Sequence, residues 1–289
     1  MNVDATGERR PLAHAVAPAF DGLILDLDGV VWLGLVPVPG SVDAIAGLRE
    51  SGVQIVFLTN DPRSSRADYA ARLTQLGIPA ESIQIVTSGS ALARYVGERE
   101  GPGAHVFAIG SPMFKAELAA SGLSLCEGLA ARAARVVAVG GHDSFDYDEL
   151  RTAAQALRRG ATLYAAGRDA AFPMPDGPWP GTGSIVAAVE VAGGTRAITV
   201  GKPEPFVFDL ARSALRKCHR IAVVGDSLES DIVGGKHAGL ATVLVLTGTC
   251  TADDVAVSPV QPDIVLPDLA ALLPKPSATP APTKQEPCS

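Results

Sequence analysis

The chain has 289 residues, of which 47% are hydrophobic, so it can bury a large core and has room for two domains of ordinary size. Its net charge is -7, and no run of Lys or Arg suits a phosphate backbone, which argues against a nucleic-acid partner. No stretch approaches the roughly 20 apolar residues of a membrane span. We therefore expect a globular protein without nucleic-acid or membrane partners.

The two ends of the chain differ in composition from the rest. Residues 1–18 and 274–289 contain few large apolar side chains, so we expect both segments to be disordered. The N-terminal segment carries Asp4, Glu8 and Arg9 without a continuous apolar run, so no export signal is expected. The four cysteines lack metal-ligand spacing. These features favour a protein of the reducing cytoplasm.

Short aliphatic runs alternate with helix-length segments along the chain. The first part predicts strands at residues 23–27 and 54–59 and helices at residues 41–51 and 64–76. The middle part predicts strands at residues 105–109, 136–139 and 162–164, helices at residues 112–120 and 147–158, and a Gly/Pro-rich loop at residues 172–183 before a helix at Ser184. The last part predicts strands at residues 197–200, 221–224, 242–246 and 264–266, with helices at residues 206–217 and 230–238. This alternation is typical of α/β proteins with parallel sheets.

Asp26 and Asp28 end the first apolar run, where ligands collect in open α/β sheets. Two carboxylates so close raise each other's pKa unless a cation neutralises them, and hard oxygen ligands suit Mg2+. One carboxylate could then attack an electrophile while the other carries a proton. The alternative is that both residues only form a turn before Gly29.

Two further strands end in groups that suit an anion. Thr59 and Asn60 follow one of them and offer a hydroxyl and a backbone N–H, although such residues also begin ordinary turns. Lys202 follows residues 197–200 and could pair with a nucleophilic carboxylate and a phosphoryl oxygen, although most lysines are solvated. Each signal is weak when taken alone.

The strand at residues 221–224 brings a third carboxylate to the same edge. Asp226 follows Gly225 directly after this aliphatic run, a rare position for a carboxylate without a role. Asp231 begins the next helix, where it could cap the helix or orient a metal ligand.

Taken in order, these residues match a known family. Asp26-x-Asp28-Gly29, Thr59-Asn60, Lys202 and Gly225-Asp226-x4-Asp231 resemble the four motifs of the haloacid dehalogenase-like (HAD) phosphohydrolases. The segments DGVVWLG, FLTN, PGTGS, GKPEP and VLVLTG resemble subfamily IIA, the NagD, 4-nitrophenylphosphatase and phosphoglycolate phosphatase type. The resemblance covers residues 21–273 and implies a Rossmann-like parallel-sheet core, at residues 19–83 and 196–273, with an inserted α/β cap domain at residues 84–195.

The resemblance also implies roles for the motif residues. Asp26 would attack phosphorus to give an aspartyl phosphate, and Asp28 would protonate the leaving alcohol and later activate water. Mg2+ would be held by Asp26, the Asp28 backbone carbonyl and Asp226, with support from Asp231. The transferring phosphoryl group would be held by Thr59, the Asn60 amide and Lys202.

The predicted cap would close over the site, select the substrate and offer a homodimer interface. The chain departs from many relatives at Asp61, where they have Asn, and at Gly167, where they have Asn before an Asp. Arg168 and Asp169 either bind a polar group of the substrate or form a loop ion pair. Trp32 and Trp179 either line the site for an aromatic substrate or pack elsewhere.

The sequence therefore predicts a Mg2+-dependent phosphomonoester hydrolase acting on a sugar, glycerol or glycolate phosphate. Pyridoxal phosphate and nucleotide monophosphates are the alternative substrates. A phosphotransferase, or a binding or regulatory protein that keeps the fold without turnover, are the rival functions.

Overall fold

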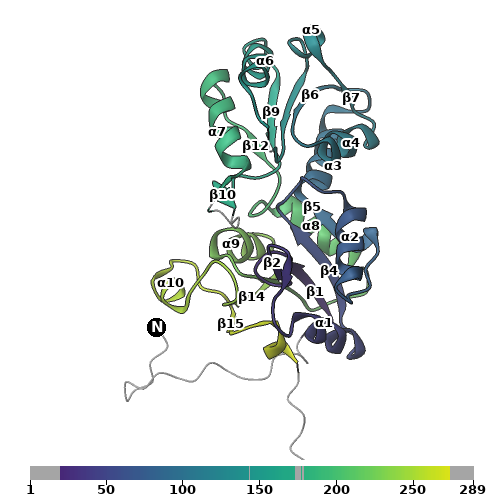
Figure 1. Ribbon diagram of the computed structural model, residues 1–289, viewed down its shortest axis with the longest axis vertical. Coiled ribbons are helices and arrows are strands. Elements are labelled where there is room, and N and C mark those ends of the chain that lie inside the picture. The colour runs from purple at the N-terminus through teal and green to yellow at the C-terminus, as the bar shows by residue number, and fades with distance from the viewer. Residues whose placement is uncertain (1–19, 143, 173–176, 178, 274–289) are drawn as a thin grey trace, which may run out of the picture.

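The computed structural model describes residues 20–142, 144–172, 177 and 179–273, so both segments predicted to be disordered lie outside the described residues. Two parallel β-sheets follow one another along the long axis of the molecule, and helices lie on their faces (Figure 1). The predicted α/β class is confirmed. We call the six-stranded sheet with its helices the lower unit and the five-stranded sheet with its helices the upper unit.

The lower sheet contains the strands that precede the predicted site residues. Its neighbours are all parallel, in the order β15 (Ile264–Leu266), β14 (Ala241–Val245), β13 (Ile221–Gly225), β1 (Gly22–Asp26), β4 (Gln54–Thr59) and β5 (Ile85–Thr87). Parallel strands end at the same edge, so β1, β4 and β13 bring their carboxyl ends together.

The aliphatic runs of these strands are continuous because helices cover both faces of the sheet. Along β1, Leu23 and Leu25 pack on one face and Ile24 on the other. The first face is covered by α1 (Ser41–Glu50), α2 (Arg66–Gln75) and the 3-10 turn Leu269–Leu272. The second face meets α8 (Pro205–Ala214) and α3 (Ser88–Glu100).

The upper sheet is inserted between β5 and β13 and is also parallel. Its order is β12 (Ile198–Thr199), β9 (Thr162–Ala165), β8 (Val136–Val139), β6 (His105–Ile109) and β7 (Ser124–Leu125). One face packs against α6 (Tyr147–Leu157) and α7 (Thr182–Gly193), and the other against α3 and α4 (Pro112–Ala120). The short helix α5 (Gly128–Ala131) follows β7.

Two strands change the division expected from the sequence. The boundary at residues 83 and 84 leaves β5 outside the core, yet β5 pairs with β4 in the lower sheet. The predicted strand at residues 197–200 was grouped with the core strands, but β12 pairs with β9 in the upper sheet. That grouping was wrong because a two-residue strand carries no pattern that specifies its neighbour. The chain therefore passes from the lower sheet to the upper sheet after β5 and returns to the lower sheet after β12.

The two units share one hydrophobic cluster. Ile24 and Val56 of the lower sheet belong to the same buried cluster as Val106 and Tyr164 of the upper sheet. Helix α3 lies between them: the Tyr95 ring meets the rings of Tyr164 and Phe206 edge-on, with centroid distances of 6.0 and 4.9 Å. The junction is thus packed and not only a pair of connecting loops.

Smaller elements complete the described chain. Two antiparallel hairpins are formed by β2 (Trp32–Leu33) with β3 (Val36–Pro37) and by β10 (Ala171–Phe172) with β11 (Trp179–Pro180). The second hairpin begins at Ala171, one residue before the predicted loop at residues 172–183, and the helix expected at Ser184 begins at Thr182. The helix expected at residues 230–238 is a π-helical turn, Leu228–Ile232, followed by α9 (Val233–His237). A 3-10 turn, Ser82–Gln84, and helix α10 (Ala252–Val257) are the remaining elements.

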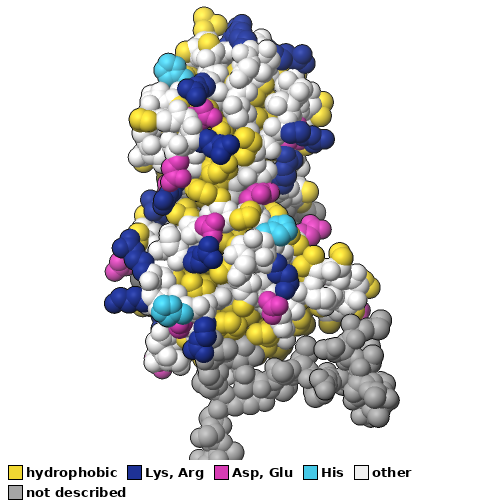
Figure 2. Space-filling model, turned by 180° about the vertical axis from the view of Figure 1, so that it is seen from behind, with side chains coloured by type: hydrophobic (Ala, Val, Ile, Leu, Met, Phe, Trp, Pro, Cys, Tyr) yellow, Lys and Arg dark blue, Asp and Glu magenta, His cyan; other side chains and the backbone are white. Residues whose placement is uncertain are grey.

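Within the described residues, no helix combines the length and apolar character needed to cross a membrane. Three cysteines, Cys126, Cys218 and Cys250, are free thiols. On the face seen in Figure 2, Lys and Arg side chains are interspersed with Asp and Glu over both units and form no continuous basic stripe.

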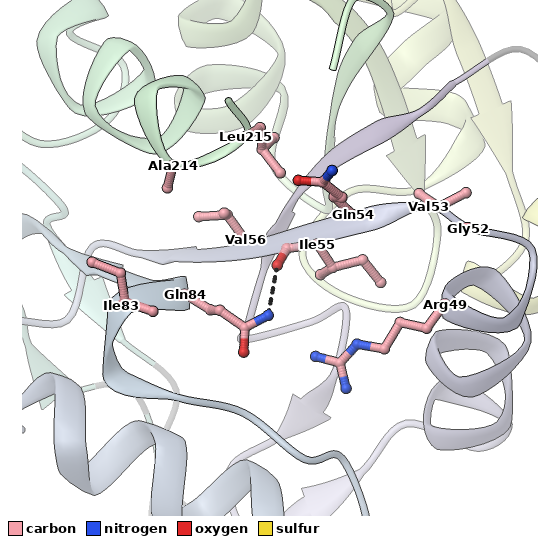
Figure 3. A pocket seen from close by; sticks show the side chains of 10 residues that line it. All are labelled: Arg49, Gly52, Val53, Gln54, Ile55, Val56, Ile83, Gln84, Ala214 and Leu215. Carbon is pink, nitrogen blue, oxygen red and sulfur yellow. Dashed lines mark hydrogen bonds between the residues drawn. The ribbon is translucent and has the colours of Figure 1, made fainter. Parts of the chain in front are cut away.

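A cavity of about 350 Å³ lies beside the amino end of β4, lined by Arg49, Gln54 and Gln84 among others (Figure 3). Of the β4 residues that line it, Val56 is nearest the carboxyl edge, about 10 Å from Thr59 at the usual rise of a strand. It is separate from the site described next.

Candidate active site

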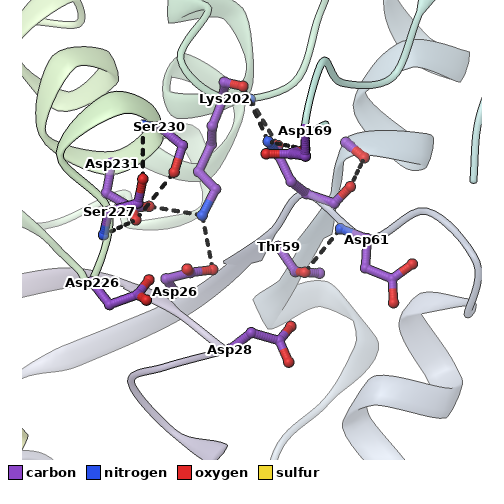
Figure 4. Close-up of polar contacts among 12 residues, drawn as sticks. Asp26, Asp28, Thr59, Asp61, Asp169, Lys202, Asp226, Ser227, Ser230 and Asp231 are labelled. Atoms are coloured by element: carbon purple, nitrogen blue, oxygen red, sulfur yellow. Dashed lines mark hydrogen bonds and ion pairs between the residues drawn. The ribbon is translucent and has the colours of Figure 1, made fainter. Parts of the chain in front are cut away.

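Three carboxylates gather at the carboxyl edge of the lower sheet (Figure 4). Asp26 is the last residue of β1, Asp226 follows β13, and Asp231 lies in the π-helical turn. Oxygens of the three side chains lie within 4.8 Å of one another, and all three side chains are buried. The closeness follows from the topology, because β1 and β13 are parallel neighbours that end together.

Lys202 brings an ammonium group into this cluster. Its Nζ lies 2.8 Å from Asp26 Oδ1 and 2.7 Å from Asp231 Oδ1, and the side chain is buried. Burial opposes the charge of this ammonium, but Asp231 and Asp26 outweigh that effect and raise the pKa of Lys202. The lysine therefore remains charged and fixes one oxygen of each carboxylate.

The cluster holds more negative charge than Lys202 can balance, since three carboxylates face one ammonium. Burial raises the pKa of Asp26 well above its usual range; Lys202 opposes this effect, and the charges of Asp231 and Asp226 add to it. Burial and the charge of Asp231 also raise the pKa of Asp226. An all-oxygen site with surplus negative charge fits a hard divalent cation.

Local backbone features make room for these carboxylates. A Cβ on Gly225 would run into the carboxyl of Asp231, and a Cβ on Gly248 would run into the carboxyl of Asp226. The Thr249 backbone N–H donates to Asp226 Oδ2 at 2.6 Å, and its hydroxyl donates to the Asp226 carbonyl oxygen at 3.1 Å. Thr249 was not among the residues predicted from the sequence. Its position directly after the VLVLTG segment, which contains most of the neighbouring strand β14, is the signal that could have indicated it.

Asp231 is already held by three donors. Besides Lys202, the backbone N–H of Ser227 donates to its Oδ2 at 3.2 Å and the hydroxyl of Ser230 at 3.3 Å. A carboxylate with these partners suits the supporting role predicted from the sequence better than direct ligation.

The Asn60 side chain clamps the loop that carries Lys202. Its Oδ1 accepts from the Lys202 backbone N–H at 2.8 Å, and its Nδ2 donates to the Lys202 carbonyl at 3.1 Å and to Asp169 Oδ2 at 3.0 Å. The role predicted for Asn60 from the sequence was limited to its backbone amide. The side chain ties the end of β4 in the lower unit to two loops of the upper sheet.

Thr59 lies at the same edge, and its Oγ1 accepts from the Asp61 backbone N–H at 3.0 Å, which leaves the hydroxyl hydrogen free to donate.

The negative charge of Asp61 is compensated by a residue two positions later in the sequence. Arg63 Nε lies 2.9 Å from Asp61 Oδ1, and Arg63 Nη2 lies 3.0 Å from Asp61 Oδ2, a two-point contact. The departure at Asp61 thus comes with its own counter-charge.

Asp28 stands apart from the buried cluster, and its side chain is exposed. Trp32 Nε1 donates to its Oδ1 at 3.0 Å. Desolvation by the surrounding protein and the charge of Asp61 raise the pKa of Asp28, against the opposing effect of the Trp32 hydrogen bond. A raised pKa suits a carboxyl group that must donate a proton. Trp32 itself is fully buried, which favours packing over contact with an aromatic substrate.

The two candidate specificity residues have different surroundings. Arg168 pairs with the buried carboxylate of Glu190, and its Nε donates to Thr199 Oγ1 at 2.9 Å. The structure therefore favours the ion-pair alternative for Arg168, within the upper unit. Asp169 instead accepts a hydrogen bond from Asn60, which also binds the Lys202 backbone. Desolvation by the surrounding protein raises the pKa of Asp169, and the positive charge of Lys202 opposes this effect. Asp169 is the member of the pair that reaches the site.

Comparisons with known proteins show which family the chain belongs to. A family model for haloacid dehalogenase-like hydrolases matches residues 23–124, and a HAD-hydrolase-like model matches residues 199–272. The glycerol-3-phosphate phosphatase of Gallus gallus is 36% identical over 87% of this chain and 89% of its own length. Human chronophin is 37% identical over 81% of this chain and 83% of its own.

A solved structure is similar as well. The crystal structure of glycerol phosphate phosphatase from Mycobacterium tuberculosis in complex with magnesium matches with a TM-score of 0.83 and 34% identity, covering 89% of this chain and 77% of that one. The chain therefore belongs to the haloacid dehalogenase-like hydrolases. Within that family it groups with the phosphatases of subfamily IIA, and the resemblance predicted from its motifs is confirmed.

Proposed function

We propose that this protein is a Mg2+-dependent phosphomonoester hydrolase that acts on small metabolite phosphates through an aspartyl phosphate on Asp26. The observation that carries the proposal is the pairing of Asp26 with Lys202 beside Asp226 and Asp231 in one buried cluster. A carboxylate oriented by an ammonium, next to a site with surplus negative charge, is suited to attack a phosphate held by a cation.

Asp26 would act as the nucleophile. Lys202 holds its Oδ1, which leaves Oδ2 to form the bond to phosphorus while the bond from phosphorus to the alcohol oxygen breaks. Mg2+, held by Asp26, Asp226 and the Asp28 carbonyl, would supply positive charge that neutralises the phosphate and the carboxylates. Asp226 is held in place for this role by Thr249 and by the close approach of Gly248.

Asp28 would move the proton in both halves of the reaction. Its protonated carboxyl gives a hydrogen to the leaving alkoxide; the resulting carboxylate then takes a proton from water as that water attacks phosphorus and releases Asp26. Lys202, the Thr59 hydroxyl and the Asn60 backbone N–H would stabilise the charge on the phosphoryl oxygens, which is greatest in the transition state.

We propose that the upper unit acts as a cap that selects the substrate. Its loop at Asp169 reaches Asn60, whose side chain also binds the Lys202 carbonyl, and this contact supports the assignment. Glycerol, sugar and glycolate phosphates are the first candidates, because two of the similar proteins are glycerol phosphate phosphatases. Pyridoxal phosphate and nucleotide monophosphates remain the alternative class. A homodimer through the cap and a cytoplasmic location remain predictions.

Hydrolysis of 4-nitrophenyl phosphate with and without Mg2+ tests the activity directly. We expect turnover only with a divalent cation, and a loss of at least about 10³-fold in Asp26→Asn, in line with the removal of a nucleophile. Asp43→Asn, which alters an exposed carboxylate on α1, is the matched control and should retain full activity.

A panel of sugar, glycerol, glycolate, pyridoxal and nucleoside phosphates would then identify the substrate class. If wild type and Asp26→Asn are equally inactive across this panel with Mg2+, the regulatory alternative replaces the enzymatic one. Analysis of products in the presence of an added alcohol acceptor separates hydrolysis from phosphotransfer.

A further inference from the structure

The exposed carboxyl of Asp28 is held from one side by a fully buried tryptophan. Trp32 Nε1 donates to Asp28 Oδ1 at 3.0 Å, and among the described residues this is the hydrogen bond that the Asp28 carboxyl receives. An indole N–H can only donate, so Oδ1 must act as an acceptor whether or not the carboxyl is protonated. The carbonyl oxygen of a protonated carboxyl is a better acceptor than its hydroxyl oxygen, so this contact favours the acidic hydrogen of Asp28 on Oδ2.

The indole has little freedom to move. The guanidinium carbon of Arg72 lies 3.9 Å from the centre of the Trp32 ring, and the Tyr69 ring lies nearly parallel to it, with a centroid distance of 6.4 Å and an interplanar angle of 7°. Arg72 also donates to the carbonyl of Gly34 in the turn between β2 and β3. Both residues come from the same face of α2, three positions apart.

The backbone fixes the other end of the tryptophan. The Trp32 N–H donates to the carbonyl of Leu27 at 3.1 Å, and the Trp32 carbonyl accepts from the Gly29 N–H at 2.7 Å. The turn that carries Asp28 is thus closed by the residue whose side chain orients the Asp28 carboxyl.

From these contacts we infer that Trp32 is a positioning residue for proton transfer: its indole N–H orients Asp28 and leaves the hydrogen on Oδ2 for the leaving alcohol. The inference rests on the proposed phosphatase function. A general acid must lie within hydrogen-bond reach of the oxygen that it protonates, so a freely rotating carboxyl is a poorer donor. A buried packing role alone would not require the N–H.

The inference predicts an effect that depends on the leaving group. An alkoxide, such as that from a glycerol phosphate, needs a proton as it leaves, whereas 4-nitrophenolate leaves as a stable anion. The value of kcat/KM reports the steps up to loss of the alcohol, so it includes this proton transfer and excludes the later attack of water. Trp32→Phe keeps an aromatic ring beside Arg72 but removes the N–H.

The experiment measures kcat/KM for glycerol 3-phosphate and 4-nitrophenyl phosphate in wild type, Trp32→Phe and Tyr69→Phe. We expect Trp32→Phe to lose about tenfold with the glycerol ester and less than about twofold with the aryl ester. Tyr69→Phe retains the ring and removes only a hydroxyl that donates to the Asp61 carbonyl, so it should leave the ratio unchanged.

A second replacement guards against misfolding of Trp32→Phe. The isosteric 3-benzothienylalanine at position 32 has sulfur in place of the N–H and preserves the shape of the indole, and it should give the same change in the ratio. Equal losses for both esters, or no loss for either, would overturn the role of Trp32. Wild-type activity and the inactivity of Asp26→Asn test the phosphatase function separately, so either idea can fail without the other.

Discussion

The two sheets present their carboxyl ends to each other, and these facing edges are built from different residues. The lower edge ends in the buried carboxylates of Asp26 and Asp226. The upper edge continues from β8 into Gly140 and Gly141 and from β9 toward Gly167. A Cβ on Gly140 would enter the ring of Phe114, and one on Gly141 would meet the Arg63 side chain of the lower unit.

The two edges therefore contribute different properties to the junction between the sheets. The lower edge supplies ionisable groups, and the upper edge has little side-chain bulk and can approach the lower loops closely. Ser111, which follows β6, donates to the Arg63 carbonyl at 3.1 Å across this junction. One exception is Asp169, which accepts from Asn60. The other is Lys202, which follows the upper strand β12 and pairs with Asp26 of the lower strand β1.

The largest expected effect comes from Lys202. Lys202→Met should lower kcat/KM for 4-nitrophenyl phosphate by about 10³-fold, because Asp26 and Asp231 lose their shared ammonium and the phosphoryl group loses a cation. Steady-state kinetics would measure it. Lys236→Met, which removes a more exposed partner of Asp263, is the control. Activity equal to that of wild type would show that the upper strand contributes no charge to the chemistry.

A second substitution separates folding from chemistry in the upper unit. The buried Glu190 pairs with Arg168 and Arg196 and accepts from the Ala197 N–H at 2.8 Å. Glu190→Gln should lower the free energy of unfolding by about 2 kcal/mol, as expected when a buried charged hydrogen bond is weakened, and leave kcat/KM nearly unchanged. Urea unfolding monitors this loss, with the exposed Glu50→Gln as control. A large loss of activity in folded Glu190→Gln would contradict the separation.

The same residue predicts a pH dependence. Burial disfavours the charge, but the Arg168, Ala197 and Arg196 contacts outweigh it and lower the pKa of Glu190 to about 2 from an ordinary value of 4.5. A depressed pKa stabilises the fold above pH 4.5, and that stabilisation is lost as the pH falls toward 2. Stability in this window should fall less steeply in Glu190→Gln than in wild type. Parallel curves for the two proteins would rule out this contribution.

Asp169 tests whether the upper edge selects the substrate. Asp169→Ala should raise KM for glycerol 3-phosphate about fivefold, as expected for the loss of one hydrogen bond to a hydroxyl, and leave kcat and the KM for 4-nitrophenyl phosphate nearly unchanged. Asp148→Ala, an exposed change on α6, is the control. An equal rise in KM for both esters would assign Asp169 to the phosphate pocket instead.

The smallest effect is expected at Asp61. Its contact with Arg63 is partly exposed, so Asp61→Asn should change the free energy of unfolding by less than about 1 kcal/mol and kcat/KM by less than about threefold. Thermal unfolding and steady-state kinetics measure both quantities. A tenfold change in kcat/KM would show that the departure at Asp61 tunes the reaction itself.

The lower edge was largely predictable from the sequence, and the reason is local. Asp26, Thr59 and Asp226 each follow an aliphatic run whose length and composition define a buried strand, and parallel strands must end together. The upper edge was less predictable. The partners of β12 and of β5 are β9 and β4, and a strand of two or three residues carries too little pattern to specify its partner.

Side-chain partners were harder still to predict. Spacing cannot show that the Asn60 amide binds the Lys202 backbone, 142 residues away in sequence, or that Glu190 engages Arg168. The tryptophan at position 32 offered two interpretations, and only its burial beside Arg72 and its hydrogen bond to Asp28 separated them. Such contacts arise from tertiary packing and leave no periodic signal.

The hydrophobic cluster shared by the two units limits where the upper unit can be exchanged with that of a relative. A chimera that replaces residues 84–195 alone would divide β5 from the lower sheet and leave β12 without its neighbour β9. It would also remove Tyr95 and Tyr164 together, so Phe206 of α8 would lose its edge-on contact with Tyr95. An exchangeable module must begin after β5, end after β12, and bring an α3 whose inner face suits the recipient's α8.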